Sequence, residues 1–323
     1  MARGDYMTGQ ASIVGWGLNA AASGTRWDGT VGTMRYNKPL PGGANFSIGA
    51  DQNPDESMDV DATSYTAGAT KHSGTIKQFL SYEHQELLLI AMLGAADSVS
   101  TSGAPYTHTL ALADLEVYLT LALYYENFKI IKFLRTYTNA LVTQITITFA
   151  PETRPIIEIS WVAQSVTAST PGAVPTLNTM TLVDWSEVTL TIDSSTACIN
   201  SGTLTISRPA DDSDITMGCD DPNVGTLFYN GQRTVQLTTE LGIDDTMETI
   251  LAATTTTVTG ALVCDNGRAT TDNRKITFTF SSLRASTLDT NPATWGKRKE
   301  SINWAVPTLA SVTVINSLEP AQV

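Results

Sequence analysis

Alternation of apolar and polar residues is the feature of this sequence that most limits its fold. It is clearest at residues 118–124, 142–149 and 156–162, where β-branched and aromatic residues recur at every second position. Successive side chains of a strand point to opposite faces of a sheet, so this period of two predicts strands with one buried face. Similar stretches predict strands at 188–192, 204–207, 235–239, 258–264 and 276–280. We therefore expect a mainly β protein.

Two segments depart from this alternation and predict helices. The first covers residues 82–93, with Ser81 as its N-cap and Gly94 after its last turn. The second covers 245–253, with Asp244 as its N-cap. Each has apolar residues at helical spacing along one face, so each is expected to flank a sheet.

The spacing of these helices indicates an internal duplication. Each helix directly follows a strand signal, at 74–80 and 233–238, and the two units lie about half a chain apart. We predict two β domains, 1–165 and 180–323, each a barrel or sandwich with one flanking helix. A linker at 166–179, rich in Pro, Gly, Ser and Thr, would separate them. The alternative is one larger β domain in which this segment is a long loop.

Charge excludes some partners. Charged residues make up 16% of the 323-residue chain, below the roughly 25% of ordinary globular proteins. The net charge is −13, opposite in sign to that of a protein that grips phosphates with Lys and Arg. We expect no tight DNA binding, although an acidic surface would let a duplex slide past.

The sequence shows no targeting or membrane signal. Residues 1–10 lack an apolar run, so no secretory signal is expected. The longest apolar stretch, 87–96, is far below the roughly 20 residues that span a bilayer. Cys198, Cys219 and Cys264 form no C-x-x-C pair and are expected to be reduced thiols.

Catalytic chemistry is missing from the sequence. It contains no nucleophile elbow, no zinc-protease motif and no phosphate-binding loop. Its histidines, His72, His84 and His108, are scattered along the chain. We therefore expect no enzymatic activity, no metal and no cofactor.

Two acidic clusters remain. The first lies within residues 39–70, a stretch without basic residues that is too long for an ordinary connection. An EF-hand reading fails, because Glu56 and Ala62 stand where Gly and Glu are needed. The members of this first cluster are Asp51, Asp55, Glu56, Asp59 and Asp61. The second cluster consists of Asp211, Asp212, Asp214, Asp220 and Asp221.

An ordered set of short motifs resembles the phage tail tube proteins, particularly those of about 300 residues with two tube-like regions. The motifs are, in chain order, Gly15-Trp16-Gly17, Ala22-Ser23-Gly24-Thr25, residues 39–45, residues 69–76, the helix end Ala91-Met92-Leu93-Gly94-Ala95, Pro105-Tyr106-Thr107-His108-Thr109-Leu110, and residues 138–147. The likeness covers residues 15–165 well and 180–315 loosely. Residues 124–137, rich in Lys and aromatics, depart from it.

The resemblance implies a structural virion protein, the major tail tube subunit, which is assembled in the cytoplasm of the bacterial host. Its strands would align across subunits into stacked rings that conduct DNA. Two domains per chain imply a ring of three chains with pseudo-sixfold symmetry; the alternative is a hexamer with the second half as decoration. Implied partners are further copies of the chain and the tape measure, tail tip and tail terminator proteins.

The resemblance also suggests a role for each acidic cluster. Residues 49–68, with the first cluster, are expected to contact the adjacent ring. The second cluster is expected in the lumen or in loops, where it would not bind DNA.

Two rival functions stay open at this stage. A secreted adhesin or carbohydrate-binding sandwich would share the Thr-rich strands, but its signal peptide is missing. The tube of a contractile injection device would share the fold.

Overall fold

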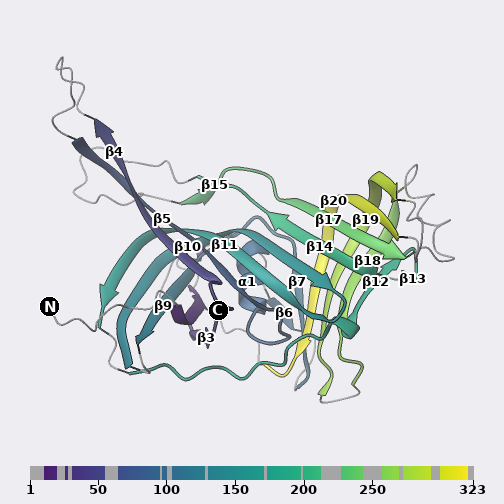
Figure 1. Cartoon of the computed structure of the whole chain (residues 1–323), viewed down its shortest axis with the longest axis horizontal. Coiled ribbons are helices and arrows are strands. Elements are labelled where there is room, and N and C mark those ends of the chain that lie inside the picture. Colours follow the sequence, from purple (N-terminus) through teal and green to yellow (C-terminus); the bar gives the residue numbers. More distant parts are fainter. Residues whose placement is uncertain are drawn as a thin grey trace.

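A computed structural model describes residues 11–19, 26–27, 31–54, 65–94, 97–99, 104–127, 130–170, 173–197, 199–211, 227–242, 257–268, 272–291 and 299–318. These residues form a curved, mainly antiparallel sheet with one helix against its inner face (Figure 1). The prediction of a mainly β protein is confirmed.

Six strands form the first half of the sheet. They are β1 (Ala11–Leu18), β4 (Ala44–Pro54), β5 (Tyr65–Phe79), β9 (Leu119–Asn127), β10 (Ile130–Ala150) and β11 (Thr153–Ser169). Their order across the sheet is β4-β5-β11-β10-β9-β1. Apart from residue 118, the three alternating stretches of the sequence lie inside β9, β10 and β11.

Six strands of the second half repeat this order. They are β12 (Val188–Ile192), β14 (Ile199–Ser207), β17 (Thr234–Gly242), β18 (Val258–Asp265), β19 (Lys275–Asn291) and β20 (Lys299–Asn316). Across the sheet they run β14-β17-β20-β19-β18-β12. If the six strands of each half are numbered in chain order, their order across the sheet is 2-3-6-5-4-1 in both halves.

Tryptophans mark equivalent rows of residues in the two halves. Trp161 of β11 lies opposite Gly74 of β5, which lies opposite Phe46 of β4. Its counterpart Trp304 of β20 lies opposite Leu237 of β17, which lies opposite Leu204 of β14. Each tryptophan follows an isoleucine by two residues, and both are buried.

A bulge lies next to each of these tryptophans. The ladder between β10 and β11 shifts register between Val142 and Gln144, directly after the pair Val142–Trp161. The ladder between β19 and β20 shifts between Ala285 and Thr287, directly after the pair Ala285–Trp304. Because a bulge bends a strand and strengthens its twist, the two long hairpins change direction at equivalent points.

One sheet continues across both halves. The first part of β10 pairs with β9, and its last residues, 144–149, pair with β14. At a second point, β20 pairs with β7 (Tyr106–Ala111). One large hydrophobic core includes residues from both halves. The division into domains 1–165 and 180–323 stays a prediction.

The smaller elements lie at the margins of the large sheet or form two separate two-stranded sheets. They are β2 (Arg26–Trp27), β3 (Arg35–Asn37), β6 (Asp97–Val99), β8 (Glu116–Val117), β13 (Ser195–Ala197), β15 (Ala210–Asp211), β16 (Phe228–Tyr229) and the 3₁₀ helix η1 (Trp185–Glu187). The main path ends at β13 and at β4, and no pairing joins these two ends among the described residues. The sheet is therefore open within one chain.

The first helix differs from its prediction in two respects. Helix α1 spans Glu86–Leu93, with Gln85 rather than Ser81 as its N-cap; Gly94 ends it as predicted, in a left-handed conformation. All eight helical residues are buried, so α1 is a core helix and not a flanking one. Its apolar run Leu87–Leu93 is enclosed on every side by the curved sheet and loops. The second predicted helix, 245–253, lies outside the described residues.

The long acidic stretch also differs from its prediction. Residues 39–70 were expected to form an unusually long connection, but β4 occupies 44–54 and β5 begins at 65. The two strands form a ladder from Ala44–Ile76 to Pro54–Tyr65. The predicted loop is thus largely an extended hairpin, because the β-forming residues of 44–50 pair with β5.

Candidate functional site

The join between β10 and β14 is the first part of the candidate site. Six backbone pairs link Gln144–Ser207 through Phe149–Gly202. Ile145 and Ile147 of β10 and Leu204 and Ile206 of β14 bury their side chains in the common core. Gly202 makes room for the Phe149 ring, because a Cβ at this position would lie 2.5 Å from that ring. Apolar packing and a backbone ladder thus hold the halves together.

A buried ion pair crosses the join near α1. Glu83, in the loop before the helix, accepts a hydrogen bond from Arg274 Nε at 2.7 Å. The other carboxylate oxygen accepts from the backbone N–H of Thr181 at 2.7 Å. The Glu83 and Arg274 side chains are only 6% and 13% exposed. Three distant segments therefore meet at one carboxylate.

The same loop contacts the end of β20. Asn316 donates from Nδ2 to the carbonyl of Tyr82 at 3.1 Å, and its Oδ1 lies 3.1 Å from His108 Nε2. The Tyr82 hydroxyl donates to Glu187 Oε2 at 3.0 Å. Burial, followed by the nearby Cys264 and Glu187, raises the pKa of Tyr82 far above its usual value, so it stays a neutral donor.

His84 lies beside this ion pair in a left-handed backbone conformation, with φ of 70°. Its carbonyl accepts a hydrogen bond from Trp16 Nε1 at 2.8 Å, and its Nε2 lies 3.2 Å from the Thr179 carbonyl. Burial, and secondarily the charge of Arg35, lowers the pKa of His84 below its ordinary value. We interpret His84 as a neutral histidine that ties the loop to residue 179 of the predicted linker.

Residues of the second half also close the C-terminal end of α1. Arg233 donates through one terminal nitrogen to the carbonyls of Leu93 at 2.8 Å and Ala113 at 2.9 Å. A cation at this end opposes the negative pole of the helix dipole. Nearby, the Tyr229 hydroxyl donates to the Val142 carbonyl at 2.9 Å. The Arg208 guanidinium lies 4.2 Å from the Tyr229 ring centre.

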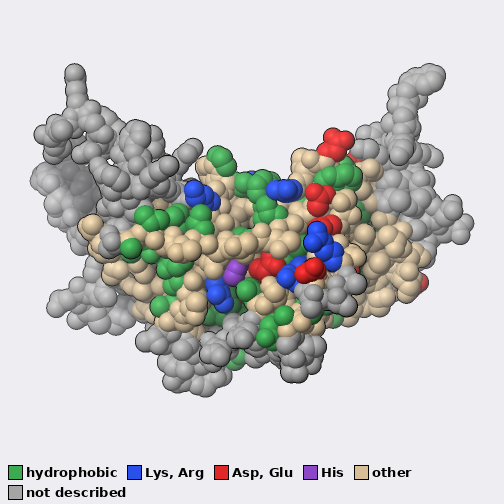
Figure 2. All heavy atoms as spheres, turned by 90° about the horizontal axis from the view of Figure 1, so that it is seen from below, with side chains coloured by type: hydrophobic (Ala, Val, Ile, Leu, Met, Phe, Trp, Pro, Cys, Tyr) green, Lys and Arg blue, Asp and Glu red, His purple; other side chains and the backbone are tan. Residues whose placement is uncertain are grey.

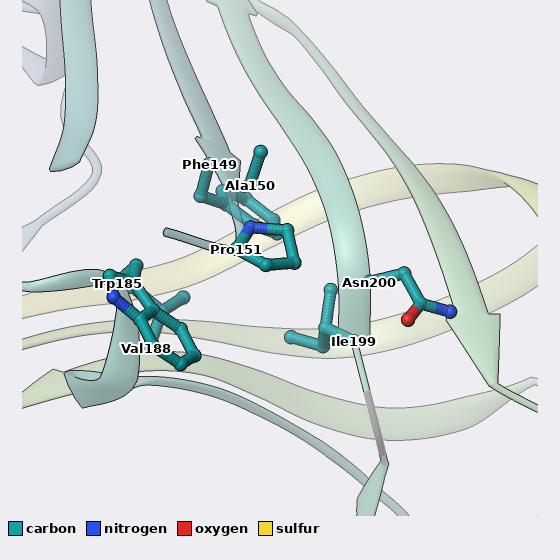
Figure 3. A pocket seen from close by; sticks show the side chains of 7 residues that line it. All are labelled: Phe149, Ala150, Pro151, Trp185, Val188, Ile199 and Asn200. Atoms are coloured by element: carbon teal, nitrogen blue, oxygen red, sulfur yellow. The ribbon is translucent and has the colours of Figure 1, made fainter. Parts of the chain in front are cut away.

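A small open pocket of about 50 Å³, lined mainly by apolar side chains, lies at the join (Figure 3). The β10–β11 turn contributes Phe149, Ala150 and Pro151; the facing wall contains Trp185 of η1, Val188 of β12, and Ile199 and Asn200 of β14. None of these side chains is ionisable, so the pocket lining carries no charge. It is a seam between packed strands of the two halves.

The histidines and the buried cysteine of the described residues lie on different elements. Within the described ranges, no group of three or more His, Cys, Asp or Glu side chains is placed to hold a metal ion. His72, His84 and His108 lie on β5, the loop before α1 and β7. The Cys264 thiol is buried and unpaired, and burial raises its pKa to about 12. His84 and His108 each contact a carbonyl of a distant segment.

The acidic clusters fall mostly outside the described residues. Asp51 lies in β4, whose outer edge has no partner strand among the described residues. Asp211 lies in β15 and pairs with Phe228. The other predicted positions, Asp55, Glu56, Asp59, Asp61, Asp212, Asp214, Asp220 and Asp221, lie outside the described ranges. Their roles stay predictions.

The chain was compared with known protein families and with curated proteins. A family model described as phage tail tube protein matches residues 51–306, which include most of each repeated half. The chain belongs to the phage tail tube protein family. A comparison with curated proteins finds no significant match.

Membership makes this tail tube protein a structural component of the virion tail. The family match spans the join, the buried loop before α1 and the cap of the helix. Within the described residues, no helix has the length and apolarity needed to span a membrane. On the face shown in Figure 2, acidic and basic side chains lie side by side rather than in a patch of one sign.

Sequence reasoning missed the residues that connect the halves. Arg274 lies 191 positions from Glu83, and Asn316 lies 234 from Tyr82, so no local pattern pairs them. A usable signal was present, however. The Ile-x-Trp repeat at residues 159–161 and 302–304 marks equivalent rows of the two halves and would have aligned them.

Proposed function

We propose that this protein is the major subunit of the tail tube and polymerises into stacked rings that conduct DNA out of the capsid. The observation that carries the proposal is the repeated strand order, with its halves joined in one open sheet. A sheet that is open within one chain can continue into another chain. Closing the series into a ring removes the exposed edges that would otherwise aggregate.

The repeat favours a ring of three chains. Two equivalent halves per chain would give six equivalent units around the ring. The alternative, six chains per ring with the second half as decoration, would leave the second set of strands outside the tube wall. The β10–β14 ladder supports the trimer, because it joins both halves within one sheet.

Charge supports passage of DNA without capture. The net charge of −13 would repel a duplex, so a lumen that displays part of this charge would let DNA slide. Asp211, Asp212, Asp214, Asp220 and Asp221 are the lumen or loop candidates. Residues 49–68, with Asp51, Asp55, Glu56, Asp59 and Asp61, are proposed to contact the adjacent ring.

Other partners follow from a tube's place in the tail. Tape measure, tail tip and tail terminator proteins would meet its lumen and its two ends, and assembly would take place in the host cytoplasm. The subunit is proposed to act without a cofactor, a metal or catalysis.

Negative-stain imaging of purified protein at increasing concentration tests the proposal. Hollow tubes or stacked rings are expected, and mass photometry of isolated rings should give three chains. Six chains per ring would end the trimer proposal. Discrete particles under every assembly condition would end the tube proposal itself.

A further inference from the structure

Several sheet edges lack a partner strand among the described residues, and two of them correspond to strands that pair within the chain. The outer edge of β4 is one, because β4 pairs only with β5. Residues 287–291 of β19 are the other, because beyond the bulge after Ala285 that strand pairs only with β20. In Figure 1 the β4–β5 hairpin and the β18–β20 strands lie at opposite ends of the molecule. Unpaired edges of this kind are templates for strand addition.

These two edges are equivalents of strands that pair within the chain. By position in the repeated order, β4 corresponds to β14 and β19 corresponds to β10. In the first half, β10 passes its bulge, leaves β9 and pairs with β14. In the second half, β19 passes the equivalent bulge, leaves β18 and ends without a second partner among the described residues.

We propose that residues 287–291 of β19 pair with β4 of a second copy of the chain, in the register that β10 and β14 use internally. This interface deepens the proposed function, on which it rests, by naming the strands that close the ring. The occupant of the β4 edge is a second copy because the chain already contains a complete example of the contact.

The rows marked by tryptophan fix the register. Ile147 pairs with Ile157, four residues before Trp161, and lies opposite Leu204 of β14. In the second half, Thr290 pairs with Glu300, four residues before Trp304. Leu204 and Phe46 occupy equivalent positions in the two halves, because each lies two strands away from the tryptophan of its own half. Thr290 is therefore expected opposite Phe46 of the next copy.

The burial pattern of β4 agrees with this register. Ala44 and Phe46 are half-buried while Asn45 and Ser47 are exposed. In β14 the side chain of Leu204 is buried while Thr203 and Thr205 on either side are only half-buried. The two strands thus alternate in phase, and β4 can take the place of β14 without turning its apolar face outward.

The contact is head-to-tail, since it joins one end of a copy to the other end of the next. A head-to-tail contact generates a closed ring when its rotation divides a full turn. Here the internal contact and the contact between copies share one geometry. Each chain would therefore contribute two equal steps around the ring.

Cysteine pairs test the register. Antiparallel pairing predicts Ser47 opposite Asp289 and Asn45 opposite Asn291 of the neighbouring copy. Directly opposed residues have Cα atoms about 4.5–5.5 Å apart, within disulfide range, whereas residues offset by two lie about 7–8 Å apart. The matched variants are S47C/D289C and N45C/N291C. The controls, S47C/N291C and N45C/D289C, use the same four substitutions in swapped pairs.

All four variants carry Cys198→Ser and Cys219→Ser, and Cys264 is kept because it is buried. Assembled protein is oxidised with copper–phenanthroline and run on denaturing gels, with the same samples imaged by negative stain. Matched pairs should give covalent dimers and trimers, at least about tenfold more than swapped pairs. Each single-cysteine variant should give none of the trimer.

The outcomes separate this interface from the proposed function. Rings or tubes that form without crosslinks in the matched pairs overturn the strand pairing and leave the tube function standing. Equal crosslinking of matched and swapped pairs overturns the register. Absence of both polymers and crosslinks overturns the interface together with the tube function.

Discussion

Trp161 and Trp304 occupy equivalent positions in the two halves but are held in different ways. Trp161 lies against the rings of Phe46 and Tyr137, each with its centre 4.9 Å away, and its Nε1 has no hydrogen-bond partner among the described residues. Trp304 instead donates from Nε1 to Thr239 Oγ1 at 2.9 Å, in a fully buried site. The two tryptophans thus share their position in the repeated sheet, whereas the contacts that stabilise each side chain differ between the halves.

The halves differ again around the loop at residues 81–85. In the first half this loop leads into the buried helix α1, and it receives Arg274, Thr181 and Asn316 from beyond the predicted linker. The first half therefore completes its polar contacts with groups of the second half. Such contacts between segments far apart in sequence make the two halves unfold together.

Breaking the buried ion pair should have the largest effect. Arg274→Met leaves the Glu83 carboxylate buried without its cation, and we expect a loss of about 3–5 kcal/mol in the free energy of unfolding. Urea denaturation of the unassembled protein measures it. In the double variant Glu83→Gln/Arg274→Met no charge is left, and Gln can still accept from Thr181, so much of the loss should return. A double variant as unstable as Arg274→Met would contradict this account.

The two tryptophans should respond unequally to the same change. Trp304→Phe removes a donor and leaves the buried Thr239 hydroxyl without its partner, which adds about 1–3 kcal/mol to the loss of packing. Trp161→Phe removes packing only, so its cost should be smaller by about that amount. Urea denaturation of both variants gives the difference, and each serves as the control for the other. Equal losses would show that the Trp304 hydrogen bond contributes nothing.

The strands could be predicted from the sequence because their signal is local. The alternation at 142–149 and 156–162 requires only neighbouring residues, and β10 and β11 contain both stretches. The helix start was misplaced because Ser81 donates to the Glu83 carbonyl at 2.8 Å instead of capping the helix. The burial of α1 on all sides depends on contacts from Arg233 and Tyr229, far along the chain, which no window around residues 86–93 contains.

Removing the cap of α1 should cost less than removing the ion pair. Arg233→Met leaves the carbonyls of Leu93 and Ala113 without this donor, and we expect a loss of about 2 kcal/mol. Arg208→Met is the matched control. Arg208→Met removes a weak ion pair to Asp114, whose side chain is 97% exposed, and the contact with the Tyr229 ring, so we expect a loss of about 1 kcal/mol. Chemical denaturation of both variants tests the ranking, and a larger loss for Arg208→Met would reverse our assignment of the cap.

The smallest effect should be a pH dependence that arises in the first half. Burial lowers the pKa of His84 in the folded protein below the unfolded value of 6.5, so the unfolded state binds a proton more readily. The stability that neutral His84 provides is complete above pH 6.5. It falls as pH drops from 6.5 through the folded pKa, by at most about 1.4 kcal/mol per pH unit.

His84→Asn tests this expectation because Asn tolerates the left-handed backbone and does not titrate in this range. Glu83 and Arg35 remain beside the site in both proteins, so the comparison isolates the imidazole of His84. Urea denaturation at pH 7.5, 6.5 and 5.5 should give a steeper decline for the unmodified protein than for the variant. The second half has no histidine at all, since residue 108 carries the last one in the chain. Identical slopes would therefore mean that His84 keeps its ordinary pKa in the fold, and that burial of the loop at residues 81–85 is incomplete in solution.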